Sequence, residues 1–121
     1  MQIKQVRSLN AAAANVNGIS FDGVNAQLPP LGGGNAWTVM LTGSAPTLHY
    51  QIQVQMIDGT WVPIAAMDGS SGVPGSDVTL AGSFPAAQGQ VFTFPGPFIN
   101  MRVSINTYTS GTLTADILVN F

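Results

Sequence analysis

The stretch that decides the fold is TLHYQIQVQM, residues 47–56. Its even positions carry apolar side chains, whereas its odd positions carry Thr, His and Gln. Successive side chains of a strand point to opposite faces of a sheet, so this alternation predicts a strand with one buried and one polar face. An Asp-Gly pair follows at 58–59 and favours a tight type I′ turn, in which both central residues have positive φ. We therefore predict a hairpin of residues 47–57 and 60–65, with Pro63 confining its second strand to a sheet edge or a bulge.

A second hairpin is predicted at the end of the sequence. FINMRVSINTY at 98–108 and TLTADILVNF at 112–121 both alternate, and Thr-Ser-Gly at 109–111 separates them. Weaker strands are expected at 3–7, 37–41 and 90–94, and a long loop over 66–89 has room for one short strand at 78–80. The 14 Gly and 8 Pro residues divide the chain into short runs. About seven or eight short strands of this kind predict an all-β protein, an antiparallel β-sandwich or jelly roll.

Residues 8–35 differ in composition from the rest of the chain. They hold an alanine run, a Pro-Pro pair at 29–30 and three consecutive Gly at 32–34. Such a segment is a poor core former, and the Gly run is typical of a flexible joint. We therefore predict an N-terminal strand followed by an extended arm or long loop over residues 1–35, and a sandwich domain over residues 36–121.

Composition excludes several classes of function. Only 7% of the residues are charged, and Cys is absent. A disulfide framework, a catalytic thiol and a Cys-based zinc site are therefore impossible. Three scattered Lys and Arg residues cannot neutralise a nucleic-acid backbone. No apolar stretch approaches the ~20 residues of a membrane helix, and the first residues lack the apolar core of a signal peptide, so we expect no membrane segment and no export signal.

The titratable residues give little support for catalysis. Three of the five Asp residues directly precede Gly, a position typical of turns: Asp22, Asp58 and Asp68. Asp77 lies in a predicted loop and Asp116 on the polar face of the last strand, and neither has a flanking pattern of a glycosidase pair. His49 is the single His, and no G-x-S-x-G sequence accompanies it. Calcium is the only credible metal, but EF-hand spacing is absent. We expect a non-enzymatic protein with no catalytic residue, cofactor or metal.

The polar strand face and the turn offer candidates for binding instead. A row of uncharged amides has a lower desolvation cost than charges, which suits a face that meets another protein, although an ordinary solvent-exposed face fits equally well. The candidate protein-contact residues are Gln51, Gln53, Gln55, Lys4 and Arg7. Most aromatic side chains have positions typical of a core. Trp61, next to the Asp-Gly turn, is the candidate for stacking against a ligand.

Residues 47–121 resemble small β-sandwich virion proteins of tailed bacteriophages. The resemblance lies in the DGTWVPI hairpin, in VFTFPGP and in NMRVSINTYTSGTLTADILV. It implies a structural protein, most simply a capsid decoration (cement) protein on the virion surface. The implied partners are the major capsid protein or other virion proteins, and the implied assembly is a homo-oligomer. A carbohydrate- or receptor-binding module, or another tail or neck component, is the alternative.

Overall fold

The computed structural model describes residues 3–21, 36–64, 78–82, 84, 89–95 and 98–120. These residues form seven strands: β1 (Ile3–Ala12), β2 (Val16–Asn17), β3 (Ala36–Gln55), β4 (Trp61–Pro63), β5 (Val78–Ala81), β6 (Gln90–Pro95) and β7 (Met101–Asn120). All pairings are antiparallel, which confirms the all-β, antiparallel prediction. The strands belong to one open sheet with β1, β7, β3 and β4 in that order. The two separate sheets of a sandwich and the connectivity of a jelly roll are therefore not confirmed.

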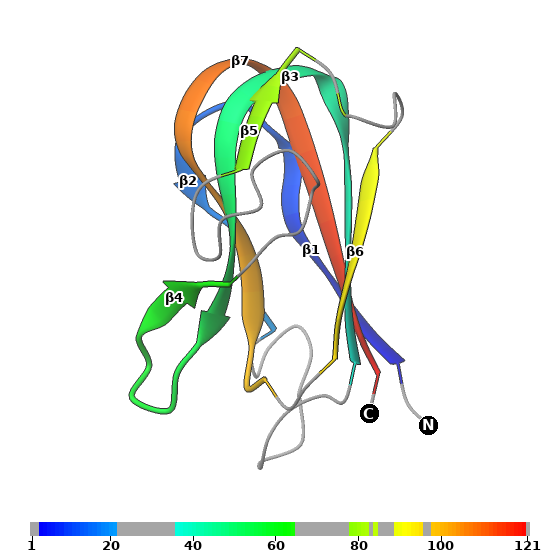
Figure 1. Ribbon diagram of the computed structural model, residues 1–121, viewed down its shortest axis with the longest axis vertical. Coiled ribbons are helices and arrows are strands. Elements are labelled where there is room, and N and C mark those ends of the chain that lie inside the picture. Colours follow the sequence, from blue (N-terminus) through cyan, green and yellow to red (C-terminus); the bar gives the residue numbers. More distant parts are fainter. Residues whose placement is uncertain are drawn as a thin grey trace.

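The predicted C-terminal hairpin is wrong, because β7 runs without interruption through residues 109–111. It pairs with β3 and not with itself. Both strands are 20 residues long, and they stay paired from Ala36 with Asn120 to Val54 with Met101. Figure 1 shows both strands bending over together, so that the sheet folds back on itself. The Thr-Ser-Gly sequence thus marks a corner of a long strand pair.

Extra residues in both strands produce this corner. Between Ser44 and Thr47, β3 has one more residue than the facing part of β7. Further along, Thr109 and Asn106 of β7 have no partner in β3, so each is an extra residue in β7. Such β-bulges bend a strand and increase its twist. Gly111 adopts a positive φ of 81° at the same corner, a conformation that glycine reaches without steric cost.

The corner divides the sheet into two halves. The first half contains β1, β6, residues 36–44 of β3 and residues 112–120 of β7, and the second contains β2, β4, β5 and the remaining parts of β3 and β7. The extra residue in β3 changes which positions face inward, from odd in the first half to even in the second. The residues of β3 that belong to the one core are Trp37, Val39, Leu41, Leu48, Tyr50, Ile52 and Val54. The alternation predicted for residues 47–56 is confirmed except at Met56, which is 51% exposed.

The hairpin of β3 and β4 is confirmed, and β4 lies at the edge of the sheet, as Pro63 predicted. Its turn differs from the prediction, because Gly59 has a positive φ of 92° and Asp58 does not. The Gly59 N–H donates to the Met56 carbonyl oxygen at 2.9 Å, and the Met56 N–H donates to the Thr60 carbonyl oxygen at 2.7 Å. The turn therefore has Ile57 and Asp58 at its centre and a left-handed glycine after them, as in three-residue hairpin loops.

The N-terminal strand is longer than the sequence predicts, because β1 continues to Ala12 along β7. Further on, the Ile19 N–H donates to the Ser8 carbonyl oxygen at 2.8 Å. Phe21 is buried, and its ring lies 5.8 Å from the ring of Trp37 in an edge-to-face arrangement. The Gly run at 32–34 lies outside the described residues, so the arm expected there and the domain boundary at residue 35 stay predictions.

Candidate functional site

The predicted glutamine row lies on the outward face of the second half of the sheet. Gln51, Gln53 and Gln55 are half-buried and alternate with the buried positions of β3. The pairing of β4 with β3 places Trp61 beside Gln55, and the pairing of β7 with β3 places Arg102 beside Gln53. Residues predicted separately as protein-contact and ligand-stacking candidates therefore share one face.

Hydrogen bonds and a ring contact connect these side chains across three strands. Arg102 Nε donates to Gln53 Oε1 at 2.7 Å, and its guanidinium carbon lies 4.3 Å from the centre of the Trp61 ring. Gln53 Nε2 donates to Gln51 Oε1 at 2.9 Å, and Ser104 Oγ is 3.3 Å from Gln53 Oε1. We call this set the amide face: Gln51, Gln53, Gln55, Trp61, Arg102 and Ser104.

The amide face carries one positive charge and many neutral donors and acceptors. Partial burial lowers the pKa of Arg102, but a guanidinium stays protonated in proteins. Its position over the indole ring adds a cation–π attraction. Of the carboxylates that the structure describes, Asp58 lies in the hairpin turn and Asp116 in the first half of the sheet. The arrangement suits binding by hydrogen bonds and flat apolar contact. Arg102 and Ser104 could not be assigned to this face from the sequence, because only the register of β7 against β3 brings them here.

The two cations predicted to make protein contacts are not near the amide face. Lys4 and Arg7 are exposed on β1, in the first half of the sheet. Arg7 Nε and a terminal guanidinium nitrogen donate to the two carboxylate oxygens of Asp116 at 2.8 and 3.1 Å. Asp116 thereby raises the pKa of Arg7. This bidentate pair joins two residues that face each other in the β1–β7 register, and the structure does not join Lys4 or Arg7 to the glutamine row.

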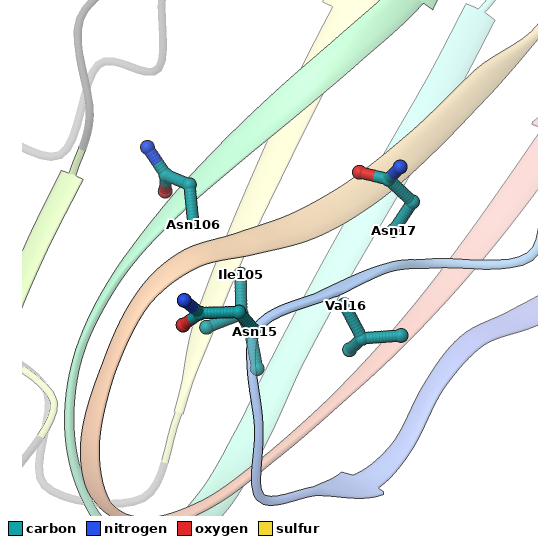
Figure 2. Close-up of a pocket in the computed structure, with 5 residues that line it drawn as sticks. All are labelled: Asn15, Val16, Asn17, Ile105 and Asn106. Atoms are coloured by element: carbon teal, nitrogen blue, oxygen red, sulfur yellow. The ribbon is translucent and has the colours of Figure 1, made fainter.

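A shallow hollow of about 280 Å³ lies between β2 and β7 and borders the amide face, because Asn17 in its lining pairs with Ser104. Its lining is formed by Asn15, Val16, Asn17, Ile105 and Asn106 (Figure 2). Three of these five residues are asparagines, and none is charged. The five residues lie in two short stretches far apart in the sequence, NVN at 15–17 and INT at 105–107, and neither was predicted as a site.

The remaining titratable residues have structural surroundings. The Thr60 N–H donates to Asp58 Oδ1 at 2.9 Å, which confirms a turn role for Asp58 and lowers its pKa. His49 is half-buried, in the same outward row of β3 as the glutamines. Asp22, Asp68 and Asp77 lie outside the described residues. Within the described ranges, no three or more His, Asp or Glu side chains gather as a metal site would require. The same ranges contain no helix with the length and apolar character needed to cross a membrane.

Two solved structures share this fold. The SPBc2 prophage-derived protein YomS matches with a TM-score of 0.67 and 13% sequence identity, over 98% of this chain and 94% of that one. The PBSX exported protein XepA matches with a TM-score of 0.68 and 16% identity. That match covers 98% of this chain but only 37% of XepA, so the chain spans little more than a third of that protein. No protein-family model and no curated protein sequence matches the chain. At these identities the likeness establishes the fold, and one of the two neighbours is prophage-derived.

Proposed function

We propose that this chain is a non-enzymatic structural protein of a bacteriophage virion, and that it binds the capsid surface as a decoration protein. The observation that carries the proposal is the fold, shared over nearly the whole of both chains with a prophage-derived protein. The resemblance of residues 47–121 to small virion proteins, on its strands and turns, supports the same class.

The amide face provides the contact surface in this proposal. Burying uncharged amides against a partner costs less free energy than burying charges. The bonds from Arg102 to Gln53 and from Gln53 to Gln51 hold these side chains in place before contact, which reduces the entropy lost on binding. The partner is the major capsid protein or another virion protein. On a symmetric lattice, we expect the chain to act as a symmetric homo-oligomer.

Co-sedimentation with capsids that lack this chain tests the proposal. We expect saturable binding of the purified wild-type protein. Gln51→Lys with Gln55→Lys would place two charges on the amide face and should weaken binding. Thr93→Lys is the matched control, because Thr93 is an exposed residue of β6 in the first half of the sheet. A wild-type protein that stays in the supernatant contradicts capsid decoration, and equal weakening by both variants contradicts the role of the amide face.

A carbohydrate- or receptor-binding module of a phage tail is the second candidate. The observation that favours it is Trp61, a half-buried indole held under Arg102 beside a row of amides. Flat aromatic rings bordered by amide donors and acceptors are suited to sugar rings. Binding of the protein to a glycan array, lost in Trp61→Ala, would support this candidate over capsid decoration. An array without a bound glycan would exclude it.

A further inference from the structure

The hollow between β2 and β7 is built around a β-bulge. Val16 pairs with Ile105 and Asn17 with Ser104, so β2 covers only the two residues that precede the bulge at Asn106. An extra residue in a strand has no cross-strand partner, and its side chain can take a new direction. In Figure 2 the carboxamides of Asn17 and Asn106 extend to the same side of the β7 ribbon. The bulge therefore places the carboxamide of Asn106 at the edge of the hollow, which we call its rim. In a regular strand this side chain would point elsewhere.

The three carboxamides on this rim retain most of their hydrogen-bonding capacity. Asn15 Oδ1 accepts the Tyr108 N–H at 2.7 Å, which fixes the side chain and leaves its Nδ2 group to donate. Within the described part of the chain, the side chains of Asn17 and Asn106 make no hydrogen bond to protein. Each supplies one acceptor and two donors. The rim thus offers both kinds of group, and one of its members is held in a fixed orientation.

Apolar atoms form the rest of the lining. Val16 is 41% exposed, and Ile105 beside it is buried. No lining residue is titratable, so the hollow has nothing to pair with an ionic ligand. A ligand that matches it is neutral, carries hydroxyl and amide groups, and has a small apolar group for Val16. Its size, about 280 Å³, suits one ring and not an extended chain.

We propose that this hollow binds an N-acetylated sugar. The acetamido group combines an N–H donor, a carbonyl acceptor and a methyl group, which correspond to the carboxamides and to Val16. The sugar hydroxyls would bond to the other carboxamides. The site shares no residue with the amide face, although its Asn17 pairs with Ser104 of that face, and it does not depend on capsid binding.

An NMR titration of the full chain with N-acetyl-D-glucosamine tests this site, with D-glucose as the matched probe that lacks the acetamido group. We expect N-acetyl-D-glucosamine to shift the side-chain amide signals of Asn15, Asn17 and Asn106, and D-glucose to shift them much less. Loss of one such hydrogen bond should weaken binding about tenfold, so Asn17→Ala and Asn106→Ala should each raise the Kd by that factor. Asn10→Ala, an exposed asparagine on β1, should leave the Kd unchanged.

Dispersed spectra of the variants would show that they remain folded, so that a change in Kd reports on the site. The proposal is overturned if N-acetyl-D-glucosamine shifts no signals, or shifts only signals of the amide face. Equal shifts with the two sugars overturn the acetamido assignment. Because none of these readouts involves capsids, a failure here is distinguishable from a failure of the proposed function.

Discussion

The side chain of Asn100 takes part in three buried hydrogen bonds. It lies just before β7, and its Oδ1 accepts the backbone N–H groups of Phe21 at 3.1 Å and of Met101 at 2.9 Å. Its Nδ2 donates to the carbonyl oxygen of Phe21. The side chain thus pairs with Phe21 as a neighbouring strand would, and it holds the Phe21 ring against Trp37 in the core.

Asn100→Ala should therefore destabilise the protein strongly. It removes the partners of three buried backbone groups, and a single unsatisfied buried group costs about 1–3 kcal/mol. The free energy of unfolding from urea titrations measures the effect. Asn10→Ala, at an exposed position of β1, is the matched control and should change stability by less than about 0.5 kcal/mol. Similar values for both variants would show that the bonds to Phe21 contribute little.

At the same scale, the candidate site could be predicted only in part. Alternation placed Gln51, Gln53 and Gln55 on one outward row, because the period of two is visible in the sequence itself. The contact of Arg102 with Trp61 was not predictable from the sequence. Trp61 lies on β4 and Arg102 on β7, and these two strands are brought near each other because both pair with β3. Contacts of that kind depend on strand register, which no short stretch of sequence contains.

At the scale of elements, the corner of β3 and β7 depends on backbone conformation at Gly111. A Cβ at this position would overlap the carbonyl oxygen of Ala45, whereas a Cβ at Gly59 would meet nothing nearby. Both glycines have positive φ. A substitution at Gly59 therefore measures the backbone strain alone, whereas one at Gly111 measures the same strain together with the steric overlap.

Gly59→Ala should cost only the strain of a left-handed residue, about 1–2 kcal/mol. Gly111→Ala should cost more, because the overlap with Ala45 is added to the same strain. Chemical denaturation of the two variants against wild type gives this comparison. If Gly111→Ala were no more harmful than Gly59→Ala, the close approach at the corner would not constrain the fold.

The β3–β4 hairpin should show a pH dependence through Asp58. The Thr60 N–H stabilises the carboxylate and lowers its pKa in the folded protein. A group with a lowered folded pKa contributes stability above its unfolded pKa and loses it as the pH falls through the folded pKa. Asp58→Ala should thus lower the urea midpoint at neutral pH, and the difference should shrink as the pH falls through the folded pKa of Asp58. A difference that is constant with pH would contradict this origin.

The sequence predicted most strands correctly but not how they join. Within the two alternating stretches, residues 101–108 and 112–120 are strand, as expected, yet they are parts of one element. A Thr-Ser-Gly sequence is compatible with a tight turn and with a bulged corner. The choice between them comes from β3, whose own corner at residues 44–47 lies opposite. The local sequence therefore shows that the regular strand is interrupted at residues 109–111, but not whether the chain makes a hairpin turn or a bulged corner there.

At the scale of the whole molecule, both halves of the sheet should unfold together. Ile117 from the first half and Ile52 from the second belong to the same core. Ile117→Ala and Ile52→Ala should each cost about 2–5 kcal/mol and leave one unfolding transition. Trp37 lies in the first half and Trp61 in the second, so Trp61→Phe leaves a fluorescence probe in the first half alone. Its midpoint should coincide with that from circular dichroism, and separate midpoints would indicate two independent units.

The pairing of Ile3 with Asn120 has a mechanical consequence. These residues begin β1 and end β7, and the start of β1 lies beside the end of β7 in Figure 1. A force that pulls them apart loads the hydrogen bonds between β1 and β7 one pair after another, starting from this end. The sheet should therefore open like a zipper at low force, with β1 leaving first and exposing Val6 and Leu9, while the long β3–β7 pair remains closed.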